Sequence, residues 1–295
     1  MLNNVLVTGG SGFVARAVLP GLAAPRLLSR SGRVPEGAPE GSVGVAHDLS
    51  AAPPPLSALE GVEAVLNLAG EPIAGHWSAD KKALIRSSRV DATRNLVQAL
   101  GQLEHRPKVL VSASAVGYYG DCADREVTEK DAPGKDYLAQ VCQDWEAAAL
   151  AAEKLGIRVV ILRFGLVAGP TGGVLEKLLM LHGVGLVPVF GFGNQWWSWI
   201  GCADLGRVIR RALADEQMSG IYNATSPRPL RCKDFVASVA SKHGARVVPM
   251  PSLALKLALG EGAQPLLCSQ RVLPARLTEL GFDFYLGSPA DAVCR

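Results

Sequence analysis

The sequence predicts an α/β protein with a doubly wound parallel sheet of about seven strands and a smaller C-terminal α+β substrate lobe. Short aliphatic runs at residues 5–7, 26–28, 64–66 and 109–111 have the pattern of buried parallel strands. Segments with helical spacing separate these runs, and such alternation is typical of a parallel sheet covered by helices. A chain of 295 residues, 48% of them hydrophobic, is also long and apolar enough to bury a large core.

The composition excludes several classes of function. The formal net charge is only +3, so no basic field attracts nucleic acid. We expect no signal peptide and no membrane association, because no apolar run reaches the roughly 18 residues that a membrane span needs. The six cysteines form no C-x-x-C pair and stand at no metal-ligand spacing from a histidine. We therefore expect reduced thiols, no metal site and a cytoplasmic location.

The first strand leads into a glycine-rich turn. Gly9 and Gly12 follow Thr8, and the helical spacing of apolar residues begins at Val14. Gly9 permits a tight turn, Gly12 lets the backbone approach a pyrophosphate, and Ala15 is small enough for close packing of helix on strand. This order of strand, glycines and helix is typical of the Rossmann-type dinucleotide fold. We expect cofactor contacts from Gly9, Ser11, Gly12, Phe13 and Val14.

The end of the second strand indicates which dinucleotide binds. An acidic residue there would bind the ribose 2′-hydroxyl of NAD, but the sequence has Ser29 and Arg30. A guanidinium can form a forked pair with a 2′-phosphate, so we expect NADP(H) as the cofactor. The alternative is an ordinary surface arginine, because the link from Gly21 to Pro25 is short and leaves the placement of Arg30 open.

Further motifs lie along the same part of the chain. They are His47-Asp48-Leu49, Asn67-Leu68-Ala69-Gly70, the strand at 109–114 that carries Ser114, and Tyr119-Gly120. Together with the G-x-x-G-x-x-A spacing, they resemble the short-chain dehydrogenase/reductase superfamily, in particular its extended branch of epimerases and dehydratases. The chain is most similar to an atypical epimerase-like group of that branch, the YfcH type, over residues 67–73, 77–82, 88–89, 117–121, 145–148, 163–167, 198–200, 260–261 and 269–282.

The resemblance implies a set of cofactor contacts beyond the glycine turn. Arg89 is expected on a helix from Ser78 to Leu100, from which its side chain would reach a phosphate or a ribose. The alternative is a solvated charge on that helix. The other implied contacts are Ser29, Arg30, Asp48, Leu49, Leu68, Ala69, Gly70, Ser112 and Val167.

The resemblance also implies a Tyr-x-x-x-Lys pair on a helix. Four-residue spacing puts the phenol and the ammonium on one helix face, where the cation lowers the pKa of the phenol. None of the five tyrosines has a lysine four residues later. Tyr137 begins the helix, expected to end at Leu155, that should carry the pair, but Val141 occupies the lysine position. A valine cannot activate a phenol.

The missing lysine leaves three hypotheses. In the first, an NADP-linked oxidoreductase or epimerase reaction uses a displaced acid or base, with Tyr119 and Tyr137 as candidates and Ser114 as a hydrogen-bond donor. In the second, the protein is a catalytically weak or inactive NADP(H)-binding sensor or scaffold. In the third, the substrate enolises so easily that it needs little activation by a base. The structural alternative is that Ser114 caps a strand end and that the tyrosines pack at a cleft wall.

The sequence patterns also predict a division of the chain into two unequal parts. Residues 1–168 and 203–226 are expected to form the dinucleotide-binding domain, and residues 169–202 and 227–295 the substrate lobe. The substrate is expected to be an unidentified small molecule, and the protein a monomer or homodimer.

Two local predictions concern the lobe and its junction with the sheet. Three tryptophans, Trp196, Trp197 and Trp199, either stack at a cleft or fill a core. Asp204 is expected to cap the helix that continues to Leu213.

Overall fold

The computed structural model describes residues 4–170, 172–285 and 287–293, and its largest element is a seven-stranded sheet. Every strand pairs in parallel with its neighbours, in the order β12-β7-β5-β4-β1-β2-β3. The chain therefore starts inside the sheet and winds outward in both directions, which confirms the predicted Rossmann-type fold. The strands are β1 (Val5–Thr8), β2 (Arg26–Ser29), β3 (Val43–Ala46), β4 (Ala64–Asn67), β5 (Val109–Ala115), β7 (Arg158–Phe164) and β12 (Gly220–Ala224).

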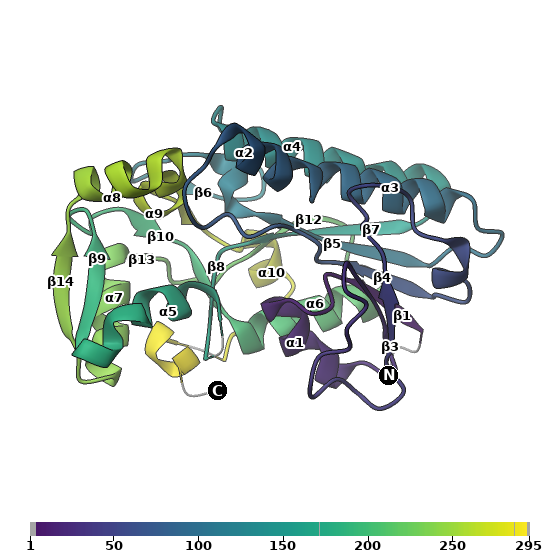
Figure 1. Cartoon of the computed structure of the whole chain (residues 1–295), viewed down its shortest axis with the longest axis horizontal. Coiled ribbons are helices and arrows are strands. Elements are labelled where there is room, and N and C mark those ends of the chain that lie inside the picture. The colour runs from purple at the N-terminus through teal and green to yellow at the C-terminus, as the bar shows by residue number, and fades with distance from the viewer. Residues whose placement is uncertain (1–3, 171, 286, 294–295) are drawn as a thin grey trace.

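Helices cover both faces of the sheet, as Figure 1 shows. Successive side chains of a strand point to opposite faces, so Val160 and Leu162 enter one hydrophobic cluster while Val159 and Ile161 enter the other. Leu277, from near the C-terminal end of the chain, belongs to the first of these clusters. The helices around the sheet are α1 (Phe13–Val18), α2 (Ala79–Ser87), α3 (Val90–Gly101), α4 (Tyr137–Leu150), α6 (Cys202–Ala214) and α10 (Ala275–Glu279).

A separate hydrophobic cluster lies among the remaining elements, on the left in Figure 1. Trp197 and Trp199 are 2% and 0% exposed there, and both rings make T-shaped contacts with the ring of Phe235. These two tryptophans therefore fill a core, whereas Trp196 is half-exposed. The elements around this cluster are β8 (Leu166–Gly169), α5 (Gly173–Leu178), β9 (Leu186–Phe190), β10 (Trp196–Trp197), β11 (Trp199–Gly201), β13 (Leu230–Arg231), α7 (Cys232–Lys242), β14 (Arg246–Met250), α8 (Ser252–Leu259) and α9 (Gln264–Leu267). The paired strands β6 (Glu126–Val127) and β15 (Arg271–Val272) belong to a smaller cluster of their own.

Two helix boundaries differ from the predictions. The expected helix from Ser78 to Leu100 is two helices, because the chain turns at Ser88, whose hydroxyl donates to Ile85 O and accepts from the amide of Glu71. The predicted N-cap role of Asp204 is also wrong. The N-cap of α6 is Gly201, and the Asp204 carboxylate instead accepts from the amide of Tyr285 and pairs with Arg207.

Short 3₁₀ turns occupy Leu19–Gly21, Leu56–Ala58, Val116–Tyr119, Ala151–Leu155, Leu179–Val184, Gly260–Ala263 and Pro289–Val293.

Candidate functional site

Two adjoining cavities lie at the carboxyl ends of the central strands. The outer cavity, of about 430 Å³, extends over the glycine turn to the end of β2. The inner cavity, of about 330 Å³, reaches from there past the end of β5 toward α9. The two share Leu68, Ala69 and Gly70, which follow β4. Open α/β sheets bind ligands at this edge, where the order of the strands reverses.

Most of the predicted cofactor residues line these cavities. The shared segment Leu68, Ala69 and Gly70 is joined in the outer cavity by Gly9, Ser11, Gly12, Ser29, Arg30, Asp48 and Leu49, and in the inner cavity by Val14, Arg89 and Val167.

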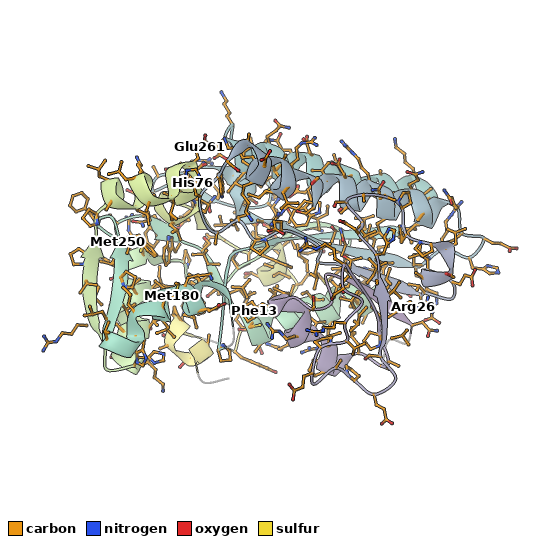
Figure 2. All side chains as sticks on the ribbon, in the orientation of Figure 1. Phe13, Arg26, His76, Met180, Met250 and Glu261 are labelled. Atoms are coloured by element: carbon orange, nitrogen blue, oxygen red, sulfur yellow. The ribbon has the colours of Figure 1, made fainter. Side chains whose placement is uncertain are left out.

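Phe13 and Ser112 line neither cavity. The ring of Phe13, labelled beside α1 in Figure 2, packs against the glycines after β8, where a Cβ on Gly172 would lie 2.5 Å from it. Ser112 is 0% exposed, and its hydroxyl accepts a hydrogen bond from Asn67. Both side chains therefore support residues around the site without lining either cavity.

The glycine turn fits closely against the segment that follows β4. Gly9 has a φ of +64°, and a Cβ there would lie 2.8 Å from the carbonyl oxygen of Leu68. Only glycine tolerates both the left-handed backbone and this contact. The amide of Gly12 donates to Gly9 O at 2.9 Å and closes the turn.

A buried hydrogen-bond network fixes the segment after β4 that the glycine turn packs against. The hydroxyl of Thr8 donates to Asn67 Oδ1 at 2.7 Å and accepts from the amides of Leu68 and Ala69. Asn67 Nδ2 donates in turn to the hydroxyl of Thr93, 2.9 Å away on α3. Every buried polar group of this network has a partner, which holds the backbone shared by the two cavities in one conformation.

Two cations and one carboxylate stand near the far end of the outer cavity. Glu71 Oε1 accepts from Lys81 Nζ at 2.9 Å, and Glu71 Oε2 lies 3.6 Å from Arg30 Nη2. The side chain of Arg30 is 71% exposed, so it can turn toward an incoming anion at little cost. Asp48 is on the same cavity, and hydrogen bonds from Ser50 lower the pKa of its carboxyl.

Arg89 lies between α2 and α3 and lines the inner cavity. Its Nη1 donates to Ile85 O at 3.1 Å, and its guanidinium is 5.4 Å from the ring centroid of Trp145. Desolvation lowers the pKa of this guanidinium. No carboxylate among the described residues forms an ion pair with Arg89, so an anionic ligand in the cavity would be its counter-charge.

Ser114 lies near the end of β5 and lines the inner cavity. Its Oγ donates to Oε1 of Glu146, on α4, at 2.6 Å. Arg163, on β7, holds the same carboxylate through Nε (2.8 Å to Oε1) and Nη2 (2.7 Å to Oε2). Glu146 and Arg163 are only 5% and 1% exposed. Because the Ser114 proton is directed at a carboxylate, Oγ can act toward a ligand as an acceptor, not as the donor that the sequence suggested.

The two candidate phenols are engaged elsewhere. Tyr119 donates to Asn223 Oδ1 at 2.7 Å and accepts from Arg163 Nη1 at 2.9 Å, and burial raises its pKa to about 12. Tyr137 donates to the backbone carbonyl of Lys82, and burial raises its pKa as well. Neither side chain lines the inner or the outer cavity.

Sequence reasoning missed Glu146 and Arg163 as members of the site. A signal was present, because each is a charged residue inside an apolar segment, in Trp145-Glu146-Ala147-Ala148 and in the strand from Arg158 to Phe164. Two opposite charges in segments expected to be buried must find each other or another partner. Their common contact with Ser114 depends on the register of β5 against β7, which the sequence does not state.

The described residues hold no group of three or more histidine, cysteine, aspartate or glutamate side chains placed to bind a metal ion. Among the same residues, no helix is both long and apolar enough to cross a membrane.

Comparison with known proteins assigns the chain to a family. Residues 5–225 match the model of the NAD dependent epimerase/dehydratase family, and residues 250–293 match a domain of unknown function (DUF1731). The chain belongs to the NAD dependent epimerase/dehydratase family. This confirms the resemblance to the extended, atypical epimerase-like branch.

Members of the epimerase/dehydratase family resemble this chain over nearly its whole length. The chloroplastic epimerase family protein SDR39U1 homolog of Arabidopsis thaliana is 38% identical, covering 98% of this chain and 85% of the relative. The crystal structure of human epimerase family protein SDR39U1 (isoform 2) with NADPH superposes with a TM-score of 0.84 at 27% identity, covering 98% and 97% of the two chains. The UDP-glucose 4-epimerase of Thermus thermophilus, in complex with NAD, has a TM-score of 0.78 at 21% identity, covering 98% and 96%, and shares the fold.

Proposed function

We propose that the protein is an NADP(H)-dependent oxidoreductase or epimerase that acts on a small alcohol or ketone. Residues 1–168 and 203–226 would hold the dinucleotide, and residues 169–202 and 227–295 the substrate. The observation that carries the proposal is the hydrogen bond from Ser114 to Glu146 at the wall of the inner cavity.

The walls of the two cavities fit an NADP(H) molecule. The turn at Gly9 and Gly12 offers a surface without side chains for a pyrophosphate, and Arg30 beside Ser29 offers a cation and a hydroxyl for a 2′-phosphate. Arg89 forms no ion pair with a described carboxylate and lines the neighbouring inner cavity. The NADPH in the crystal structure of human SDR39U1 supports the same cofactor here.

When bound, the cofactor supplies or accepts a hydride. Side chains of the protein must then remove a proton from the substrate oxygen or supply one to it. In alcohol oxidation, Ser114 Oγ accepts the proton of the substrate hydroxyl while its own proton passes to Glu146 Oε1, and in ketone reduction both protons move back. Arg163 orients the carboxylate through two hydrogen bonds, so Glu146 presents Oε1 to the serine.

The geometry supports a different acid/base group from the tyrosine of the superfamily. Tyr119 has a pKa of about 12 and donates its proton to Asn223, and Tyr137 donates to a backbone carbonyl. A catalytically inactive NADP(H) sensor is the second candidate, and the absence of a lysine at Val141 favours it. The third hypothesis, an easily enolised substrate, differs because it requires no help from Glu146.

A panel of alcohols with NADP⁺, and of ketones with NADPH, tests the proposal by the change in absorbance of the reduced nicotinamide. Ser114→Ala and Glu146→Gln should each lower kcat at least 100-fold, in line with the usual value of general acid–base catalysis of about 10²–10⁴. The matched controls are Ser241→Ala and Glu153→Gln, both at exposed positions outside the cavities, which should keep the wild-type rate. Tight NADPH binding without turnover on any compound would establish the sensor instead. Turnover that survives Glu146→Gln would favour the enolisation hypothesis.

A further inference from the structure

A third cavity, of about 740 Å³, opens next to the inner cavity. We call it the lobe cavity, and it lies between the turn after β9 (Gly191–Gln195) and the segment from α8 to α9 (Ser252–Leu267). It shares Gln264 and Cys268 with the inner cavity. The body of a substrate whose reacting oxygen meets Ser114 would therefore extend past these two residues into the lobe cavity.

The wall of the inner cavity offers little charge to a substrate. Arg89 and Asp136 are its charged residues among those described. Asp136 is the N-cap of α4, where its Oδ1 accepts from the amide of Ala139 at 3.0 Å. Arg89 is the residue proposed above for the cofactor. No cation of the inner cavity is therefore left for an anionic substrate.

The lobe cavity is no more basic. Its charged residues among those described are Asp121, Lys256 and Glu261. Among these residues Lys256 is the one cation, and it stands with two carboxylates, those of Asp121 and of Glu261, which pairs with Lys82. In Figure 2, Glu261 is labelled next to His76 at the upper edge of the lobe. Sites for phosphate groups use arginine clusters or several cations, and burying an unpaired phosphate charge is expensive.

The polar groups that remain are neutral. Ser114 presents an acceptor, as described above. The side-chain amide of Gln264 is half-buried, lines both cavities, and forms no hydrogen bond with the described residues. A ligand group can hydrogen-bond this amide without breaking a hydrogen bond within the protein, for a net gain of about 1 kcal/mol.

Much of the remaining wall of the inner cavity is apolar. Leu138, Val141, Phe164 and Pro265 line the inner cavity. Phe192, with 91% of its surface exposed, stands at the rim of the lobe cavity. An apolar ligand body covered by these side chains gains about 25 cal/mol for each Å² removed from water.

We propose that the substrate is an uncharged, largely apolar alcohol or ketone, that Gln264 provides its second polar contact, and that nucleoside-diphosphate sugars are excluded. This inference rests on the function proposed above, because it places the reacting oxygen at Ser114. The proposed substrate class differs from that of the UDP-glucose 4-epimerase of Thermus thermophilus, with which this chain shares the fold.

Calorimetric titration of protein saturated with NADPH, in which an alcohol cannot be oxidised, tests the inference. The probes are 2-butanol, 2-hexanol, 2-octanol and UDP-glucose, and the hydroxyl of each alcohol can donate to Ser114 and accept from Gln264. Affinity should rise about fourfold for each added methylene, the equivalent of about 0.8 kcal/mol per buried methylene. UDP-glucose should show no binding at concentrations that saturate the protein with 2-octanol. Affinity that is independent of chain length, or UDP-glucose binding as tight as that of 2-octanol, would overturn the inference.

The variant Gln264→Leu tests the specificity residue. Loss of one neutral hydrogen bond, worth about 1 kcal/mol, should weaken every alcohol about fivefold while the gain per methylene stays the same. The control Gln217→Leu, at an exposed position outside the cavities, should change neither quantity. Unchanged alcohol affinity in Gln264→Leu would remove Gln264 from the site. Alcohols that bind but are never oxidised by NADP⁺ would overturn the proposed function and leave the substrate class intact.

Discussion

Ser114 and Glu146 are joined by a 2.6 Å hydrogen bond between β5 and α4, and Arg163 donates to both oxygens of the same carboxylate. The serine comes from a strand end and faces the inner cavity, while the carboxylate is 5% exposed behind it. The superfamily to which this chain is related places a tyrosine and a lysine on the corresponding helix. Here that helix contributes a buried carboxylate instead.

Removing the Glu146 carboxylate should destabilise the fold. In Glu146→Ala, the guanidinium of Arg163 stays buried without its counter-charge, and breaking a buried ion pair in this way typically costs about 3–5 kcal/mol. Urea denaturation should show that loss in the free energy of unfolding. Glu153→Ala, at an exposed site, should change it by less than about 0.5 kcal/mol. An unchanged midpoint in Glu146→Ala would mean that Arg163 finds another partner.

Arg30→Ala should weaken NADPH and leave NADH unchanged. We propose that this guanidinium binds the 2′-phosphate that only NADPH carries, and a hydrogen bond to a charged group contributes about 1.5–3 kcal/mol. Fluorescence titration of both cofactors should show a 10- to 100-fold loss in NADPH affinity, which is the same range converted at about 1.4 kcal/mol per factor of ten. Arg33→Ala, a nearby exposed arginine outside the outer cavity, serves as the control. Equal losses for both cofactors would exclude the assignment of Arg30.

A comparison of Gly9→Ala with Gly37→Ala separates the effect of backbone strain on NADPH binding from the effect of a steric clash. Both glycines have positive φ, at +64° and +76°, so alanine is strained at each, by about 1 kcal/mol. Only Gly9 has a neighbour, because a Cβ there would lie 2.8 Å from Leu68 O, whereas nothing lies within 4 Å of one on Gly37. We expect Gly9→Ala to abolish NADPH binding and Gly37→Ala to keep it. Similar NADPH affinities in both variants would show that the turn does not form the cofactor surface.

Val141→Lys should not restore a tyrosine–lysine pair. Val141 is 2% exposed, so the new ammonium would be buried and should lower stability by several kcal/mol. The hydroxyl of Tyr137 would still be held by the carbonyl of Lys82. Thermal unfolding should show a lower Tm, and turnover should not rise. Gln140→Lys, one residue earlier and exposed, is the control for the added charge, and a gain in kcat in Val141→Lys alone would contradict the argument.

Tyr119 should add stability that is lost at high pH. Burial raises the pKa of its phenol from 10.0 to about 12, so the folded state holds this proton more tightly than the unfolded chain. The contribution is complete below pH 10 and disappears as the pH rises through 12. The difference in free energy of unfolding between the wild type and Tyr119→Phe should shrink by about 2–3 kcal/mol over that interval. Tyr285→Phe, at a 63% exposed residue, should give a constant difference, and a constant difference for Tyr119→Phe would refute the shift.

Local patterns were sufficient to predict much of the fold. The run from Val5 to Val7 before Gly9 and Gly12 predicted a strand, turn and helix, because backbone conformation there depends on residues close in sequence. Helix boundaries were less predictable. Asp204 resembles an N-cap in the sequence, but the amide that its carboxylate accepts from belongs to Tyr285, 81 residues away.

By itself, the sequence determined the strand–turn–helix order, the family, and the absence of a Tyr-x-x-x-Lys pair, since each is written in adjacent or evenly spaced residues. Only the tertiary structure decided what faces the inner cavity. The parallel register of β5 and β7 and the packing of α4 bring Ser114, Arg163 and Glu146 together, although up to 49 residues separate them along the chain. Burial then forces the two opposite charges to pair, because neither could remain unpaired away from water.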